Sequence, residues 1–239
     1  MKVAFFKLEP LEKNYIKNHE SMAGHELLFF DHILSKDDIP DNISFEVASV
    51  FVDSIIDSEV ISKLPNLKMI ATRSTGYDHI DMETAKKNGI VVTNVPAYGE
   101  NTVAEFTFAL LLTLSRKIFE SHHRIKEEGS FNLNGLRGFD LKGKILGVVG
   151  TGRIGVHVIK IAKGFDMKVI ANDTFPNKDL EKEMGFEYVS LEEVLEKSDV
   201  ITLHVPYIKE THHLINKNNT KLIKKGAYLI NTSRGSIVE

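Results

Sequence analysis

The stretch 144–155 constrains the fold of this chain more than any other part of its sequence. Residues 145–149 (Ile-Leu-Gly-Val-Val) are apolar or glycine and predict a strand that is buried on both faces. Gly150, Gly152 and Gly155 follow with G-x-G-x-x-G spacing, and apolar side chains then recur at helical spacing. Strand, glycine turn and helix in this order are typical of a site that cradles a dinucleotide pyrophosphate. We expect Gly150 to permit the tight turn, Gly152 to leave space for phosphates and Gly155 to let helix and strand pack closely.

An acidic residue ends the next predicted strand. Asp173 follows residues 168–172, about 20 residues beyond the glycine turn. A carboxylate at this place binds the adenosine ribose hydroxyls and repels a 2′-phosphate. Because no arginine follows in residues 174–176, we expect NAD rather than NADP as cofactor. The alternative is a glycine turn of some other α/β sheet, with Asp173 only capping a loop, and it requires four separate features to coincide.

The composition argues against several classes of function. The formal net charge of −3 gives no reason to expect a nucleic acid or a membrane as partner. Cysteine is absent, which excludes disulfides and thiolate metal sites and fits a reducing cytoplasm. The N-terminus turns polar at Lys7, too early for a signal peptide, and the most apolar run, residues 106–114, is too short to span a bilayer. We therefore expect a cytoplasmic protein.

The chain divides into two predicted domains, residues 1–99 and 100–239, because Pro96 and Gly99 interrupt the pattern between them. In the first domain, short apolar runs alternate with amphipathic stretches, which predicts a parallel sheet with helices on both faces. The second domain shows five strands after Gly143, where a six-stranded dinucleotide-binding sheet needs one more. The predicted strands are 3–6, 26–30, 46–51, 67–72, 91–95, 145–149, 168–172, 186–189, 199–204 and 227–231, and helices are predicted at 11–19, 58–64 and 81–88.

Two further helices are predicted to begin with a capping box, at residues 102–105 (Thr-Val-Ala-Glu) and 190–193 (Ser-Leu-Glu-Glu). The first reaches about Arg116 and is apolar nearly all round, which requires burial between domains or in a subunit interface. Beyond it, His122 and His123 are adjacent and therefore point apart on a helix, and no other metal-ligand pattern accompanies them. We expect both histidines to face solvent and no metal to be bound.

Two loops at predicted strand ends are candidates for binding a carboxylate. Residues 74–76 (Ser-Thr-Gly) are placed to offer successive backbone amides to an anion, although an ordinary strand-to-helix turn explains them equally well. Arg234 follows the strand 227–231, and its planar guanidinium suits a carboxylate and can polarise a carbonyl oxygen. The alternative for Arg234 is a surface arginine bonded to a helix end. His204 also ends a strand, where contact with the adenosine side of a dinucleotide is favoured over a general base.

Five motifs then occur in the order in which one protein family carries them. They are the glycine turn, the segment 73–81, the pair 95–98 with 102–105, the segment 203–206 (Leu-His-Val-Pro) and the segment 231–235 (Asn-Thr-Ser-Arg-Gly). Together they resemble the D-isomer-specific 2-hydroxyacid dehydrogenases, over nearly the whole chain. The resemblance implies two doubly wound parallel sheets: a flavodoxin-like substrate domain and a Rossmann NAD-binding domain without its last strand or strands. It also implies hydride transfer between NAD and a D-2-hydroxy acid.

The resemblance implies roles for particular residues. Arg234 matches the catalytic arginine, which binds the carboxylate and carbonyl of the substrate. Further substrate contacts are implied for Ser74, Thr75, Gly76 and Tyr98, the last of which favours a D-lactate-like substrate. Contacts with the cofactor are implied for Thr102, Gly150, Gly152, Arg153, Ile154, Gly155, Asp173, His204, Val205, Pro206, Thr211, Thr232 and Ser233. A homodimer is usual in the family and is therefore expected here.

The family members continue beyond the arginine loop, with a glutamate and a histidine that move the proton of the substrate hydroxyl. We therefore expect the 239-residue chain to bind NAD but to turn over slowly. Loss of positioned acid–base help costs a factor of roughly 10²–10⁴. Two alternatives stay open: an NAD(H)-binding regulatory protein, because some relatives are NAD-sensing corepressors, and an inactive truncated fragment.

Overall fold

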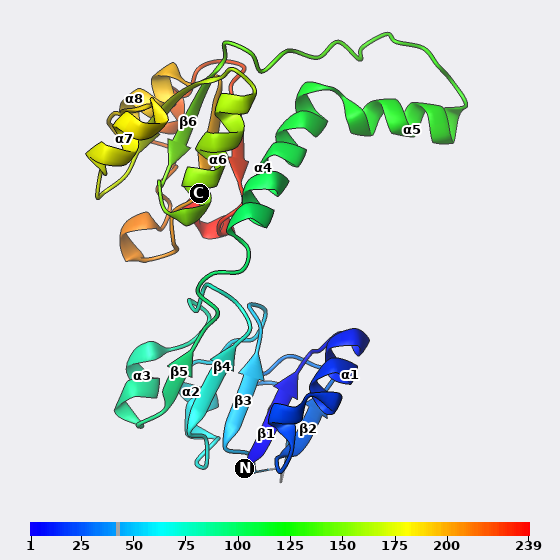
Figure 1. The fold of residues 1–239 in the computed structure, drawn as a ribbon, viewed down its shortest axis with the longest axis vertical. Coiled ribbons are helices and arrows are strands. Elements are labelled where there is room, and N and C mark those ends of the chain that lie inside the picture. Colours follow the sequence, from blue (N-terminus) through cyan, green and yellow to red (C-terminus); the bar gives the residue numbers. More distant parts are fainter. Residues whose placement is uncertain (42–43) are drawn as a thin grey trace. The chain divides into compact units, whose positions relative to one another are not determined.

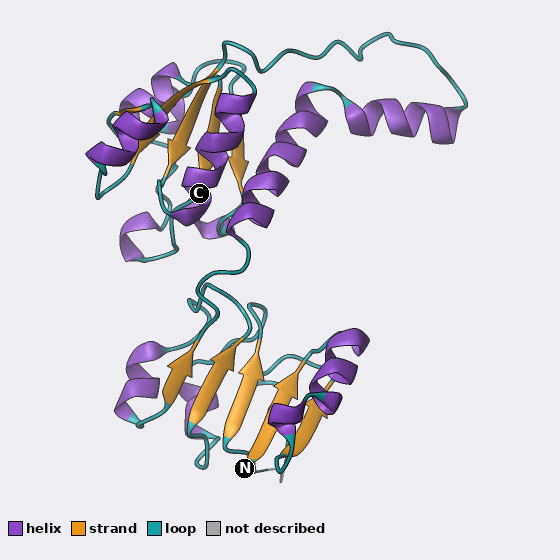
Figure 2. Cartoon of the chain, viewed as in Figure 1, coloured by secondary structure: helices purple, strands orange, loops and turns teal. Residues whose placement is uncertain are grey.

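The computed structural model describes residues 1–41 and 44–239 and divides the chain into two compact units, residues 1–98 and 99–239. The described residues of each unit form one parallel five-stranded sheet accompanied by helices (Figure 1). In both units, helices connect most of the successive strands (Figure 2). The predicted fold class, two doubly wound parallel sheets, is confirmed.

The first unit has the strand order β2-β1-β3-β4-β5, which is the order of flavodoxin-like sheets. Its strands are β1 Lys2–Phe6, β2 Glu26–Phe30, β3 Val47–Val50, β4 Met69–Thr72 and β5 Val91–Thr93. Its helices are α1 Pro10–Asn18, α2 Ser58–Ser62 and α3 Met82–Lys87. Apolar side chains of the strands and connections, among them Phe6, Ile56 and Ile70, are fully buried and form its core. Burial of this kind is the main force that stabilises such a unit.

The second unit has the strand order β10-β9-β6-β7-β8, in which the first strand of the unit lies at the centre. This is the arrangement of the first five strands of a dinucleotide-binding sheet. The strands are β6 Ile145–Val149, β7 Lys168–Asn172, β8 Glu187–Tyr188, β9 Val200–Leu203 and β10 Tyr228–Asn231. The helices are α4 Glu100–Ser115, α5 Ile118–Glu128, α6 Arg153–Gly164, α7 Lys178–Met184 and α8 Leu191–Lys197. The central strand β6 is flanked by β7 and β9, with its Val148 fully buried.

The capping box predicted at residues 102–105 is wrong, whereas the second one is confirmed. Helix α4 begins at Glu100 with Gly99 as its N-cap, so that residues 102–105 lie inside the helix. Glycine is tolerated at an N-cap, and an acidic residue in the first turn is stabilised by the helix dipole. At the start of α8, the Ser190 hydroxyl accepts a hydrogen bond from the Glu193 amide at 3.1 Å. The Glu193 carboxylate accepts one from the Ser190 amide at 3.4 Å.

One face of α4 is buried within its own unit, and the predicted burial of the rest between domains or in a subunit interface stays a prediction. Ala104, Thr107, Phe108 and Leu111 are buried within the second unit, but the side chain of Phe106 is 57% exposed. Helix α5, which was not predicted as an element, follows α4 and extends away from the sheet of its own unit (Figure 1). None of the α5 residues is buried. His122 and His123, both on α5, are exposed as predicted.

The described residues lack two features. No helix within residues 1–41 and 44–239 is long and apolar enough to cross a membrane. The same residues contain no group of three or more histidine, aspartate or glutamate side chains placed to hold a metal ion.

Candidate functional site

The glycine turn after β6 has the geometry that close backbone contacts require. Gly150 has φ +94°, and a Cβ at this position would lie 2.6 Å from the carbonyl oxygen of His204. A Cβ on Gly155 would overlap the carbonyl oxygen of Gly150. In contrast, a Cβ on Gly152 would meet no atom of the described residues within 4 Å. Packing therefore requires glycine at positions 150 and 155, whereas Gly152 leaves open space beside the turn.

The start of α6 fits a phosphate group. Helix α6 begins at Arg153 with Gly152 as N-cap, and no described side chain caps it. The first amides of a helix lack intrahelical acceptors and lie at the positive end of its dipole. Arg153 adds a positive charge, held 3.5 Å from the carboxylate of Glu100. The start of a helix, a positive charge and the open space at Gly152 together suit a pyrophosphate.

Asp173 is held rigidly at the end of β7. Its Oδ2 accepts hydrogen bonds from the Thr151 amide at 2.6 Å and from the Thr151 hydroxyl at 2.8 Å. Its Oδ1 accepts one from the Phe175 amide at 2.9 Å. Burial raises the pKa of Asp173, but the hydrogen bonds from Phe175 and Thr151 outweigh this effect and leave the pKa below its ordinary value. The carboxylate is therefore ionised at neutral pH, as binding of ribose hydroxyls requires.

His204 lies at the end of β9 beside the glycine turn. Its Nε2 lies 2.9 Å from the Thr202 hydroxyl, and its amide donates to the Val149 carbonyl at 2.7 Å. Burial lowers the pKa of His204 to about 4. The imidazole is therefore neutral at physiological pH, so the position suits packing and hydrogen bonding rather than a charged contact.

Acid should destabilise the protein partly through His204. Its folded pKa of about 4 lies below the ordinary value of 6.5, so the unfolded chain takes up a proton first as the pH falls. The contribution of neutral His204 to the free energy of unfolding is complete above about pH 6.5. It is lost as the pH falls to about 4, and its size is about 2–3 kcal/mol. Between pH 7 and 4.5, we expect His204→Gln to lose about that much less of its unfolding free energy than the unchanged protein, measured with urea. The exposed His123→Gln serves as control, and an equal loss in all three proteins would contradict the prediction.

The loop after β9 uses the predicted cofactor residue Thr211 for its own structure. The Thr211 hydroxyl donates to the Pro206 carbonyl at 2.6 Å and accepts from the Ile208 amide at 2.9 Å. It thus closes the segment that begins with Val205 and Pro206. The role of Thr211 in this structure is to shape the loop.

Arg234 lies in a loop that side chains fix at the end of β10. The Asn231 side chain accepts a hydrogen bond from the Ser233 amide at 3.0 Å and donates one to the Arg234 carbonyl at 2.8 Å. The Ser233 hydroxyl donates to the Leu203 carbonyl at 2.8 Å, which ties the loop to β9. Thr232 reaches the buried Thr107 of α4, with 3.2 Å between their hydroxyl oxygens. Asn231 was not singled out from the sequence, although an amide side chain three residues before an arginine in a strand-end loop is a usable signal.

In the first unit, the loop after β4 offers amides rather than side chains. Ser74 is buried, and its hydroxyl donates to the Gly76 carbonyl at 2.7 Å, so this side chain shapes the loop. The Thr75 hydroxyl donates to the Val95 carbonyl at 2.9 Å. Within the described part of the chain, the backbone amides of Thr75 and Gly76 donate to no partner. The predicted anion site at residues 74–76 therefore depends on backbone amides and stays a prediction.

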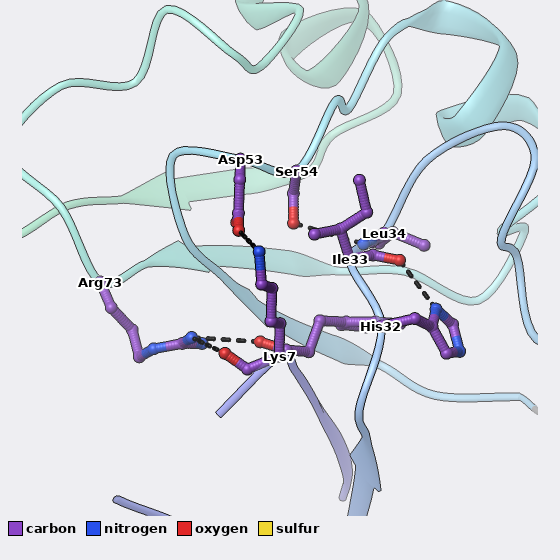
Figure 3. Close-up of polar contacts among 8 residues, drawn as sticks. Lys7, His32, Ile33, Leu34, Asp53, Ser54 and Arg73 are labelled. Atoms are coloured by element: carbon purple, nitrogen blue, oxygen red, sulfur yellow. Dashed lines mark hydrogen bonds and ion pairs between the residues drawn. The ribbon is translucent and has the colours of Figure 1, made fainter. Parts of the chain in front are cut away.

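Arg73, which precedes this loop, fastens the carboxyl edge of the first sheet. Its guanidinium donates to the Ser49 hydroxyl at 3.2 Å and to the carbonyls of Phe6 and Lys7 at 3.1 and 3.4 Å. Figure 3 shows the contact with Lys7 beside the ion pair from Lys7 to Asp53, whose atoms lie 2.5 Å apart. The sequence placed Arg73 in a motif but indicated no role for it. The two remaining predicted residues, Tyr98 and Thr102, are exposed.

The sequence of this chain is similar to those of known proteins, and these similarities identify its family. Residues 108–239 match the family model described as D-isomer specific 2-hydroxyacid dehydrogenase, NAD binding domain. The chain is 42% identical to 2-hydroxyacid dehydrogenase homolog 1 of Schizosaccharomyces pombe, over all of this chain and 72% of that protein. It is 36% identical to D-lactate dehydrogenase of Escherichia coli, over all of this chain and 73% of that protein.

Solved structures agree with these matches. The apo-structure of D-lactate dehydrogenase from Escherichia coli has a TM-score of 0.86 at 36% identity, covering 100% of this chain and 76% of that one. The structure of D-lactate dehydrogenase from Aquifex aeolicus, complexed with NAD and lactic acid, has a TM-score of 0.90 at 41% identity. It covers 99% of this chain and 70% of that one. Sequence, fold and the dinucleotide-type glycine turn thus agree, and the chain belongs to the NAD-dependent D-isomer-specific 2-hydroxyacid dehydrogenase family.

Proposed function

We propose that this protein interconverts a D-2-hydroxy acid and its 2-oxo acid with NAD as cofactor, and that lactate and pyruvate are the preferred pair. One observation carries the proposal. Three adjacent strands of one sheet, β6, β9 and β10, end in the glycine turn, in His204 and in the Arg234 loop, respectively. Because ligands of such sheets bind outside the carboxyl ends of the strands, dinucleotide-binding and carboxylate-binding groups share one edge.

The second unit, predicted as residues 100–239, is the proposed NAD-binding domain. The amides at Gly152, Arg153 and Ile154 bind the pyrophosphate, and Asp173 binds the adenosine ribose. Thr232 and Ser233 lie beside the nicotinamide amide, while Thr102 and the segment from His204 to Pro206 complete the contacts. Thr211 acts by shaping that segment. When bound, NAD supplies or accepts the hydride that changes the oxidation state of the substrate carbon.

The first unit, predicted as residues 1–99, is the proposed substrate domain. The amides of Thr75 and Gly76 bind the substrate carboxylate, and Tyr98 contacts the small side chain of a lactate-like substrate. In the second unit, Arg234 is the proposed carboxylate ligand, and its planar guanidinium also suits polarising the oxygen at C2 of a 2-oxo acid. The positive charge of the guanidinium beside this oxygen stabilises the negative charge that develops on the oxygen during hydride transfer. The names of the Escherichia coli and Aquifex aeolicus relatives support lactate as the substrate.

A binding and turnover assay tests the proposal. NADH is titrated into the purified protein by calorimetry, and the absorbance of NADH is then followed after addition of pyruvate, with glyoxylate and 2-oxoisocaproate as competitors. We expect NADH to bind, pyruvate to be the best of the three substrates, and the product to be oxidised by a D-specific but not by an L-specific lactate dehydrogenase. Absence of NADH binding, or an L-product, would refute the proposal.

We also propose that two copies of the chain associate through α4, α5 and the segment that follows. Exposed apolar side chains recur along these three consecutive segments: Phe106, Phe119, Ile125 and Phe131 are 57%, 69%, 53% and 82% exposed. Large exposed apolar surface often marks an interface. Sedimentation should show a dimer for the unchanged protein and a monomer for the double variant Phe119→Asp, Ile125→Asp. Phe175→Asp, at a site that is 86% exposed outside these elements, should remain a dimer. A monomeric unchanged protein would contradict the proposal.

A cytoplasmic location is proposed as well. The chain contains no cysteine, which suits a reducing compartment. Fractionation of the source cells, with the protein detected by antibody, is the measurement that checks this. Recovery in a membrane or secreted fraction would contradict it.

A further inference from the structure

A chain of two hydroxyl groups reaches Asp173 from the neighbouring strand. The Tyr188 hydroxyl of β8 lies 2.8 Å from the Thr151 hydroxyl, which in turn lies 2.8 Å from Oδ2 of Asp173. Thr151 lies in the glycine turn, between Gly150 and Gly152, whereas Tyr188 lies 37 residues further along the chain. The two meet because β8 pairs with β7, with Tyr188 opposite Ala171.

The chemistry of these groups fixes the direction of both hydrogen bonds. An ionised carboxylate can only accept, so the single hydroxyl proton of Thr151 points to Asp173. The Thr151 oxygen must then act as acceptor toward Tyr188, and the tyrosine hydroxyl is the donor. Tyr188 is itself held in place, because its amide donates to the Glu181 carboxylate at 2.8 Å and its ring packs on Phe186. The hydroxyl chain therefore runs in one direction, from Tyr188 through Thr151 to Asp173.

These bonds limit how Asp173 can receive a ligand. A carboxylate has about four acceptor sites. Two sites on Oδ2 are filled by the Thr151 amide and hydroxyl, and one site on Oδ1 is filled by the Phe175 amide. The second site of Oδ1 is not filled by these three bonds, while the Thr174 amide adds a weaker contact that also lowers the pKa of Asp173. The carboxylate is therefore oriented to accept one ribose hydroxyl on Oδ1.

We propose that Thr151 and Tyr188 are positioning residues that hold Asp173 in this orientation, and that they thereby set the preference of the protein for NAD over NADP. The inference rests on the proposed role of Asp173 at the adenosine ribose. A fixed, ionised Asp173 accepts the free 2′-hydroxyl of NAD and repels the 2′-phosphate of NADP. A carboxylate that is free to rotate away loses the hydrogen bond with the 2′-hydroxyl, and its repulsion of the 2′-phosphate becomes weaker. Loss of the hydroxyl chain should therefore change the ratio of the NAD and NADP affinities, and it should not lower both affinities equally.

Calorimetric titration of NADH and NADPH into single variants tests this inference. Thr151→Val should lower NADH affinity about tenfold, which is the usual effect of losing a hydrogen bond to a charged group. Its NADPH affinity should stay equal or rise, so that the NADH/NADPH affinity ratio falls about tenfold. Thr151→Ser keeps the hydroxyl and should restore the ratio to within about twofold. Tyr188→Phe should lower the ratio about threefold, because a neutral hydrogen bond to the intermediate hydroxyl is lost.

The matched control is Tyr228→Phe in the same unit, since among the described residues the Tyr228 hydroxyl makes no hydrogen bond while its ring stacks on Phe139. An unchanged ratio in Thr151→Val, or an equal loss for both dinucleotides, would overturn the positioning role. Failure of the unchanged protein to bind NADH is a different result and would overturn the proposed function itself. A readout without cofactor is the ¹³C chemical shift of the Asp173 carboxyl during acid titration. Thr151→Val should raise the pKa of Asp173, and an unchanged pKa would also overturn the inference.

Discussion

Replacement of Arg234 by glutamine is expected to lower kcat/KM for pyruvate by about 10³-fold while leaving NADH affinity within about twofold. In the proposed role of Arg234, the guanidinium makes charge-assisted hydrogen bonds to the substrate and places positive charge beside the reacting oxygen, and losses of this kind reach several kcal/mol. Asn231 and Ser233 hold the loop through bonds that do not involve the Arg234 side chain, so the fold should persist. Steady-state reduction of pyruvate, with NADH binding measured by calorimetry, checks both parts.

Two further variants make the result specific to geometry. Arg234→Lys keeps the charge but loses the planar fork, and it should recover no more than about tenfold of the loss. The exposed Arg137→Gln in the same unit should leave kcat/KM unchanged. Binding of oxamate to the NADH-saturated protein gives a readout that needs no turnover and should weaken in Arg234→Gln. A kcat/KM within about threefold of the unchanged protein would show that Arg234 does not touch the substrate.

Valine in place of Gly155 is expected to abolish measurable NADH binding and to lower the melting temperature of the second unit by roughly 10 °C. Any Cβ at this position overlaps the Gly150 carbonyl oxygen, which belongs to backbone and cannot rotate away. Overpacking costs about 1–3 kcal/mol or more, and in a protein of this size each kcal/mol corresponds to about 2–4 °C. Thermal unfolding and calorimetric NADH titration together measure the effect.

Gly152 and Gly164 provide the matched comparison. A Cβ on either would meet no described atom within 4 Å, so alanine at either position should leave the melting temperature nearly unchanged. Gly152→Ala should nevertheless weaken NADH binding at least about tenfold, because its methyl group occupies the proposed phosphate space. Gly164→Ala, at the other end of α6, should bind NADH normally. Equal NADH affinities in these two variants would contradict the assignment of the turn to the pyrophosphate.

The parts of this structure that the sequence predicted are those encoded by neighbouring residues. A buried strand, three glycines at fixed spacing and an apolar helix face are local signals, and β6, the turn and α6 followed them. Apolar alternation likewise predicted the five strands of the first unit, with ends displaced by a residue or two. The histidines of α5 faced solvent as predicted, although the helix itself was missed because no apolar stripe of α5 packs inside its unit.

The parts that escaped prediction depend on residues far apart in the chain. Thr151 and Tyr188 meet only through the pairing of β7 with β8, and no spacing rule connects them. Arg73 donates to the carbonyl of Phe6 at the end of β1, which lies 67 positions earlier in the chain. The hydroxyl of Ser74 donates within its own loop, which the sequence did not predict, and the predicted substrate contact of its backbone amide stays a prediction. Helix α4 starts at Glu100, before the predicted capping box, with Gly99 as its N-cap.

The parallel arrangement of both sheets has a practical consequence for labelling. All of the proposed binding loops leave the carboxyl ends of strands, so the turns that enter the strands lie at the opposite edge of each sheet. Asn66, before β4, and Lys225, before β10, are exposed positions in such turns. Since the native chain has no thiol, one cysteine introduced at either place would be the sole attachment point for a fluorophore or spin probe. Each unit can thus be monitored separately during ligand binding, with the reporter remote from the chemistry.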